Sequence, residues 1–131
     1  MSLETFARQY VATMLWSSTD ESTPQGGEPL DKNYDSCDIA PEAMEKIKAD
    51  CTAFYNAHHL TWFDELTAIP DLDEDGRAGH DFWLTRNGHG AGFWDGDWTE
   101  PAATLLTTAS KAFGECHPYI GDDGLIYLYE G

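Results

Sequence analysis

The sequence predicts a single α+β domain, in which about three helices pack with a small antiparallel sheet made of two hairpins. Three segments place apolar residues at helical spacing, and short apolar runs around glycine-rich turns supply the strands. The length of 131 residues fits one domain spanning residues 1–131. A hydrophobic content of 41%, with 5 Trp, 6 Tyr and 6 Phe, predicts a packed core rather than a disordered acidic chain.

The first helix is predicted at the N-terminus and is followed by a long loop. Leu3, Phe6, Tyr10 and Met14 recur at the spacing of one helical face. From residue 17 to 40 the composition changes to Ser, Thr, Asp, Glu, Pro and Gly, and the apolar period is lost. We therefore predict a long acidic surface loop over 17–40, part of it mobile.

The second helix is predicted to begin at Pro41, because proline suits the first helical position. Side chains at helical spacing follow it: Met44, Ile47, Cys51, Phe54, Tyr55 and His58. Cys51 lies on the apolar stripe and is expected in the core. Residues 59–67 either continue this helix or form a short second one, and Pro70 ends it.

The next segment is predicted to be a hairpin. Residues 81–86 and 91–95 are short aromatic runs, and Asn87-Gly88-His89-Gly90 between them tolerates the positive φ of a tight turn. Adjacent strand residues point to opposite faces, so one residue of each pair, Phe82–Trp83 and Phe93–Trp94, must meet a second layer, a helix or a partner. Among the aromatic residues, we expect Trp94 and Trp98 to contact a binding partner.

A third helix and a second hairpin complete the predicted fold. Residues 100–113 return to helical spacing, with Gly114 at the end. Residues 117–120 and 125–129 flank Gly121-Asp122-Asp123-Gly124, which is typical of a hairpin turn.

The charge balance excludes several function classes. The chain has 24 acidic and 7 basic side chains, a formal net charge of −17. Nucleic-acid binders gain affinity through Lys and Arg, and anionic membranes also attract basic segments, so neither is an expected partner. Three cysteines without a C-x-x-C pair favour a reducing compartment, and the first residues lack the pattern of a secretory signal. A cytoplasmic location is expected.

Motifs for catalysis and metal binding are weak. Asp71-Leu72-Asp73-Glu74-Asp75-Gly76 matches the opening of a calcium loop, but the twelfth position is Phe82 instead of a bidentate carboxylate. A zinc site would have to be assembled from distant residues such as His80, His89 and Cys116. No nucleophile lies in an activating motif. We predict no catalytic residues, no cofactor and no metal, and a calcium- or zinc-binding protein remains an alternative.

The aromatic segment also resembles a known group of proteins. The run GHDFWLTRNGHGAGFWDG over 79–96, followed by YIGDDGLIY over 119–127, is similar to a family of small proteins encoded mostly by bacteriophages and mobile elements. No activity is known for that family as a whole, and the resemblance supplies no catalytic residues. The resemblance implies a protein made in the bacterial cytoplasm that acts on a host component.

The density of negative charge leads to the principal hypothesis. Nine of the 24 acids lie in residues 20–50 and seven in residues 64–81. Seventeen charges correspond to about 29 Å of duplex DNA, and a domain of this length has a diameter of about 36 Å. We therefore predict a DNA-mimicking inhibitor of a host DNA-binding or defence protein, of the restriction, CRISPR, topoisomerase or nuclease class.

The partner-binding acids expected for such a mimic lie in the later acidic segments: Asp64, Glu65, Asp71, Asp73, Glu74, Asp75, Asp95, Asp97, Asp122 and Asp123. The alternative is a protein–protein interaction module that uses exposed aromatics such as Trp94, Trp98 and Tyr129 instead of charge.

Overall fold

Helices α1 (Leu3–Ser17) and α2 (Pro41–Phe63) form where the apolar spacing predicts them. The computed structural model describes residues 3–20, 28–63, 74–88, 92–93, 98 and 100–130. Within that range α2 continues unbroken to Phe63, so the first of the two possibilities for residues 59–67 is confirmed up to that residue. Pro70 lies outside the described residues.

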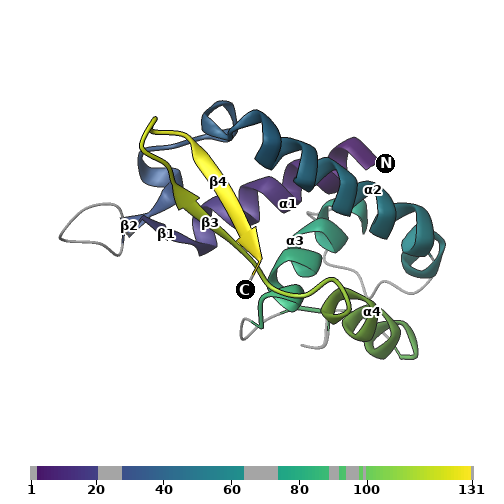
Figure 1. Cartoon of the computed structure of the whole chain (residues 1–131). Coiled ribbons are helices and arrows are strands. Elements are labelled where there is room, and N and C mark those ends of the chain that lie inside the picture. Colours follow the sequence, from purple (N-terminus) through teal and green to yellow (C-terminus); the bar gives the residue numbers. More distant parts are fainter. Residues whose placement is uncertain are drawn as a thin grey trace.

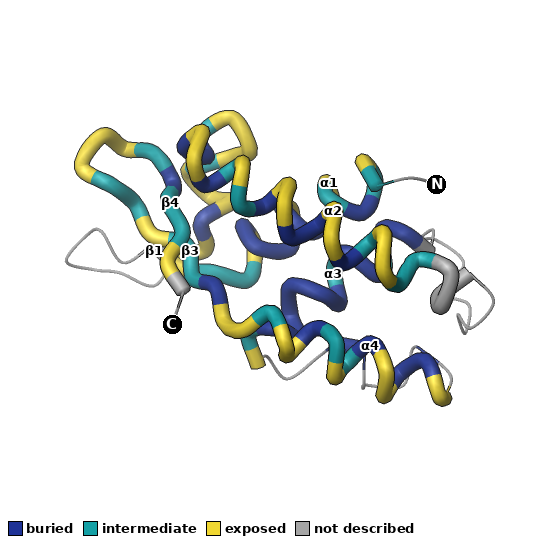
Figure 2. The backbone as a smooth tube through the Cα atoms, turned by 45° about the vertical axis from the view of Figure 1, so that its right-hand side comes forward, coloured by how far each residue is buried: buried dark blue, intermediate teal, exposed yellow. Residues whose placement is uncertain are grey.

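The predicted hairpin around residues 81–95 is wrong, because its first strand is part of a helix. Helix α3 spans Glu74–Arg86 and lies against α1, α2 and α4 (Figure 1). It is buried over most of its length, as its dark blue colour in Figure 2 shows. Polar residues such as Asp81, Thr85 and Arg86 are buried in this helix together with its aromatic residues, so its sequence lacks the amphipathic period that identifies surface helices.

The last two elements agree with the sequence prediction. Helix α4 spans Ala102–Lys111, and Gly114 follows it with φ of 76°. Strands β3 (Cys116–Ile120) and β4 (Ile126–Glu130) then pair as an antiparallel hairpin, in which Tyr119 lies opposite Tyr127.

The segment from 17 to 40 holds more structure than the predicted surface loop. Strands β1 (Thr19–Asp20) and β2 (Glu28–Pro29) pair antiparallel, and the 3-10 turns η1 (Leu30–Lys32) and η2 (Ser36–Asp38) follow. Leu30 is fully buried and donates its backbone N–H to the carbonyl of Ser18 at 2.9 Å. One leucine among polar residues therefore anchors the segment to the core.

The core is an aromatic stack between the helices. Phe54 of α2 lies over Phe82 of α3 with ring centroids 4.1 Å apart and planes 13° apart, and Phe6 of α1 contacts both rings. All three side chains are fully buried. Cys51 is also fully buried, so its predicted core position is confirmed. With its helices packed together and its strands confined to two small sheets, the chain is an α+β domain.

Candidate partner-binding surface

Acidic side chains from two distant parts of the chain gather at one end of the molecule. The turn between β3 and β4 lies beside the start of α2 and the 3-10 turns (Figure 1), and these turns are exposed (Figure 2). We call this region the acidic end and define it by the following residues: Glu28, Asp31, Asp35, Asp38, Glu42, Glu45, Asp122 and Asp123.

Backbone contacts hold the two parts of the acidic end together. The N–H of Ala40, just before α2, donates to the carbonyl of Ile126 in β4 at 2.8 Å. Ile39 and Ile126 also form a parallel bridge, and Ile126 is fully buried. The hairpin turn is thereby fixed next to the first turn of α2.

Two of the carboxylates in this region also shape the local backbone. Asp35 accepts a hydrogen bond from the N–H of Cys37 at 2.8 Å, and Asp38 accepts one from the N–H of Asp35 at 2.9 Å. This reciprocal arrangement is a capping box, which satisfies backbone donors at the start of η2. The two carboxylates are therefore held in fixed positions near the surface.

The lysines in this region leave most of its negative charge uncompensated. Lys32 pairs with Glu28 at 3.0 Å, and Lys46 pairs with Asp50 at 3.1 Å. The other acids of the acidic end make no ion pair with a lysine or an arginine within the described residues. A basic partner could therefore bind them without first displacing an internal cation.

The outer face of the β3–β4 hairpin carries a row of aromatic rings. His117 contacts Tyr129 with ring centroids 5.4 Å apart, Tyr129 contacts Tyr119 at 5.7 Å, and Tyr119 contacts Tyr127 at 5.8 Å. Tyr119 is 45% exposed and Tyr129 is 53% exposed. We call these four residues the aromatic ladder.

The ladder meets the acidic end at the hairpin turn. The hydroxyl of Tyr127 donates to Asp123 Oδ2 at 2.6 Å. This bond raises the pKa of Tyr127 to about 12 and lowers the pKa of Asp123, so Asp123 stays ionised at lower pH than a free aspartate does. A Cβ on Gly121 would lie 2.5 Å from the Tyr127 ring, so glycine leaves room for that ring over the turn.

Two residues predicted to face a partner are buried instead, and these predictions are wrong. Asp75 is fully buried in α3, and Trp98 is only 4% exposed. The indole N–H of Trp98 donates to Asp81 Oδ2 at 2.6 Å, which explains how this polar group is satisfied in the core. Asp122 and Asp123, in contrast, are exposed at the hairpin turn, and Tyr129 is exposed on β4.

The remaining predicted partner-binding residues lie outside the described part of the chain: Asp64, Glu65, Asp71, Asp73, Trp94, Asp95 and Asp97. Glu74 is the first residue of α3. The fourth to sixth positions of the calcium-like stretch are therefore helical, whereas a calcium loop needs them in a turn.

A histidine–aspartate pair on α3 was not anticipated from the sequence. His80 Nδ1 lies 2.8 Å from Asp81 Oδ1, and the His80 ring stacks on Trp16, which is 46% exposed. Adjacent helical residues normally diverge, so no sequence signal points to this pair. A buried carboxylate that also binds Trp98 is suited to fixing the orientation of the imidazole.

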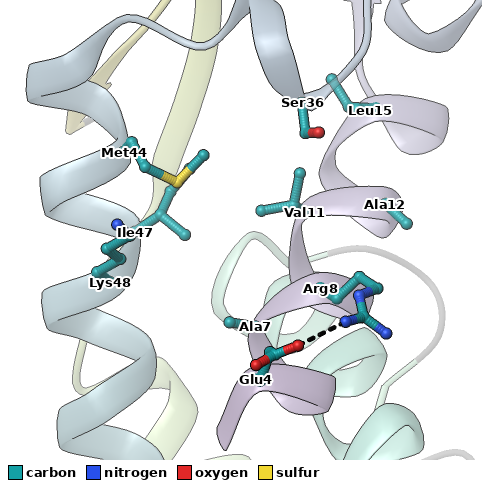
Figure 3. Close-up of a pocket in the computed structure, with 10 residues that line it drawn as sticks. All are labelled: Glu4, Ala7, Arg8, Val11, Ala12, Leu15, Ser36, Met44, Ile47 and Lys48. Carbon is teal, nitrogen blue, oxygen red and sulfur yellow. Dashed lines mark hydrogen bonds and ion pairs between the residues drawn. The ribbon is translucent and has the colours of Figure 1, made fainter.

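An apolar groove runs between α1 and α2 (Figure 3). Its volume is about 400 Å³, and its walls include Val11 and Leu15 from α1 and Met44 and Ile47 from α2. The ion pair between Glu4 and Arg8, 2.8 Å long, lies at one end. A groove of this size can accept apolar side chains of a partner.

Within the described ranges, no three His, Cys, Asp or Glu side chains come together as ligands for a metal ion. His80 and Cys116 belong to those ranges, whereas His89 does not. None of the helices in that part of the chain combines the length and apolar character that a membrane crossing requires.

Sequence reasoning missed much of the acidic end. The acids between Asp31 and Glu45 contribute to the net charge, but no local sequence pattern assigns them to a binding surface. Their proximity to Asp122 and Asp123 depends on tertiary contacts at Ile126. The aromatic ladder could have been found, because alternate residues of a hairpin share one face.

Comparison of the chain with protein-family models, with curated proteins and with solved structures finds no match. The similarity to small bacteriophage and mobile-element proteins therefore remains an expectation from the sequence. The candidate surface rests on residue chemistry and geometry alone.

Proposed function

We propose that this protein binds the basic, nucleic-acid-binding surface of a partner protein through its acidic end and thereby excludes nucleic acid from that surface. The observation that carries the proposal is the convergence of acids from residues 28–45 and from the β3–β4 turn on one end of the molecule. Carboxylates placed there substitute for backbone phosphates opposite Arg and Lys of the partner.

The net charge of −17 also supports the proposal. Excess charge of one sign destabilises a small folded protein through self-repulsion, but it also steers a basic partner to the surface. In the setting that the phage-like sequence implies, the partner is a host DNA-binding or defence protein in the bacterial cytoplasm. The protein then acts as an inhibitor without an enzymatic activity of its own.

The test has two steps. Partners are first captured from a bacterial lysate at low salt, and a captured partner is then bound to labelled duplex DNA and titrated with the protein. We expect the wild-type protein to release the DNA and to lose this ability as salt increases. DNA that stays bound at saturating protein would contradict the proposal.

A matched pair of variants locates the effect. Glu42→Gln with Glu45→Gln removes two charges from the acidic end, and Glu4→Gln with Glu100→Gln removes two charges elsewhere. Glu4 lies near the N-terminus at the opposite end of the molecule (Figure 1), and Glu100 is exposed just before α4, away from the hairpin turn. We expect the first pair to weaken DNA release and the second to leave it unchanged.

A second candidate function is binding of a partner through the apolar groove between α1 and α2 (Figure 3). Ala12 lines this groove and is exposed, so Ala12→Arg fills it without disturbing the core. If this candidate is correct, partner binding persists at high salt, is lost in Ala12→Arg, and is unchanged in the Glu42 and Glu45 variant.

A further inference from the structure

The aromatic ladder lies on the face of the β3–β4 hairpin where Tyr119 and Tyr129 are exposed. His117, Tyr119, Tyr127 and Tyr129 occupy alternate positions on two paired strands, so their rings share the outer face of the hairpin. Neighbouring centroids are separated by 5.4 to 5.8 Å along the row. The opposite face carries Ile126, which is fully buried.

Two hollows flank the contact between Tyr119 and Tyr127. One, of about 430 Å³, is lined by both tyrosines together with Asp122 and Asp123 of the turn. The other, of about 340 Å³, is lined by the same tyrosines and by Glu42 of α2. Each hollow therefore combines an aromatic ring with at least one carboxylate.

The tyrosine rings are arranged so that one is fixed and one is accessible. Tyr127 is anchored by its hydrogen bond to Asp123, whose other oxygen accepts the N–H of Leu125 at 3.0 Å. Tyr119 lies against Tyr127 with planes 26° apart and keeps 45% of its surface exposed. The exposed surface of Tyr119 is thus held in place before a ligand binds, which lowers the entropy lost on binding.

This combination selects a flat cation. A guanidinium stacks on an aromatic face and at the same time donates hydrogen bonds to a carboxylate. A lysine ammonium is a strongly hydrated point charge and gains less from stacking. Bases of a nucleic acid also stack on tyrosine, but their phosphates would be repelled by Glu42, Asp122 and Asp123.

We propose that Tyr119, supported by Tyr127, binds an arginine side chain of the partner, with Glu42 or Asp122 pairing with its guanidinium. This inference rests on the proposed function. It adds that arginine is the residue type of the basic partner that the acidic end recognises. Lys46 also lines the hollow on the α2 side, but its ammonium is held by Asp50 at 3.1 Å. It therefore does not occupy the position of the incoming cation.

The experiment is a titration of the full chain with short peptides, followed by NMR. The probes are a blocked tripeptide with a central arginine and the same peptide with lysine or citrulline in its place. We expect the arginine peptide to shift the resonances of Tyr119, Tyr127 and Gly121 in a saturable manner. The lysine peptide should bind more weakly, and the neutral citrulline peptide should cause no saturable shift.

Two variants at Tyr119 test the role of the ring. Because cation–π contacts at exposed sites are modest, Tyr119→Leu should raise the dissociation constant of the arginine peptide roughly two- to fivefold. Tyr119→Phe retains the ring and should bind nearly as the wild type does. The exposed position of Tyr119 makes both variants compatible with the fold, and an unchanged melting temperature checks this.

The proposal is overturned if arginine and citrulline peptides cause the same shifts, if lysine binds as tightly as arginine, or if Tyr119→Leu binds unchanged. Its failure can be distinguished from failure of the proposed function, because the titration does not require the partner. If the protein releases DNA from the partner but does not bind arginine selectively, the proposed function stands and the arginine site at Tyr119 is ruled out. If arginine binds selectively and this binding depends on Tyr119, but DNA is not released, the arginine site stands and the proposed function is ruled out.

Discussion

At the scale of single residues, Arg86 is a buried charge that needs several hydrogen-bond partners in the core. Its side chain is fully buried, and its guanidinium donates to Asp50 at 2.8 Å and to the hydroxyl of Tyr10 at 3.1 Å. It also donates to the carbonyls of Gly114 and Phe113 at the end of α4. Burial acts to lower the pKa of Arg86, but Tyr10 and Asp50 together raise it, so the buried cation is stabilised.

Replacing this arginine should be much more costly than replacing an exposed one. Arg86→Met removes the buried cation that faces Asp50, leaves that carboxylate with its ion pair to Lys46, and leaves two carbonyls without their donor, so we expect a loss of about 3–5 kcal/mol in the free energy of unfolding. Arg8→Met breaks the exposed ion pair with Glu4 and should cost less than about 1 kcal/mol. Urea denaturation measures both, and equal costs would contradict the role given to Arg86.

Residue positions were predictable where the side chain is purely apolar. Cys51 and Phe54 lie in the core as their helical spacing predicts. Asp75 was misplaced because a carboxylate is assigned to the surface unless a buried partner is known. Trp98 was misplaced because its ring contact with Phe93 and its bond to Asp81 are tertiary contacts. The hydrogen bond from Trp98 to Asp81, across 17 positions of the chain, cannot be inferred from local patterns.

At the scale of elements, α3 shows why the predicted hairpin failed. Its aromatic run is too short to distinguish a strand from a buried helix by periodicity. Its buried face includes Asp81, Thr85 and Arg86, which interrupt the apolar pattern. Helices α1, α2 and α4 each keep an exposed side, and for them the pattern was sufficient.

The close approach of α3 to α1 depends on Gly79. A Cβ at this position would overlap the backbone carbonyl oxygen of Phe6. Helix propensity alone would make Gly79→Ala stabilising by about 1 kcal/mol. We expect the opposite sign, a loss of about 1–3 kcal/mol, because the overlap forces the helices apart. Thermal or urea unfolding decides between the two, and a stabilised variant would refute this packing.

The β3–β4 turn gives a prediction about pH. Since the bond to Asp123 raises the pKa of Tyr127 to about 12 from an ordinary value of 10.0, the hydroxyl stays protonated in the folded hairpin. Its contribution to stability is therefore complete below pH 10 and is lost as the pH rises through about 12. Asp123→Asn should lower the pKa of Tyr127 toward 10, which an NMR titration of the tyrosine ring measures.

A control for this titration is Asp122→Asn, which removes the neighbouring charge and leaves the hydrogen bond in place. It should change the pKa of Tyr127 much less. If both variants shift that pKa equally, general electrostatics would explain the effect, and the fixed position of the Tyr127 ring would lose its support.

At the scale of the whole molecule, the sequence predicted the net charge and the α+β class but not where the charge gathers. The acids of η1, η2 and the start of α2 are separated from the hairpin turn by more than half of the chain. They meet because Ile39 and Ala40 dock on Ile126. Such long-range docking is decided by core packing, which a single sequence does not reveal through its periodicity.

The effect of where the charges lie on partner binding can be distinguished from the effect of how many there are, because salt shortens the range of electrostatic interactions. At physiological ionic strength the Debye length is about 8 Å, so charges at the far end of the molecule contribute little to binding. Glu42 and Glu45 should therefore influence a partner at the acidic end more than Glu4 and Glu100 do, although each pair contributes two charges.

The most direct test of the central claim is the affinity for the captured partner, measured against salt concentration for the wild-type protein and both double variants. We predict that Glu42→Gln with Glu45→Gln lowers the affinity and flattens its salt dependence. Glu4→Gln with Glu100→Gln should follow the wild-type curve. Identical curves for the two variants, or an affinity independent of salt, would contradict binding through the acidic end.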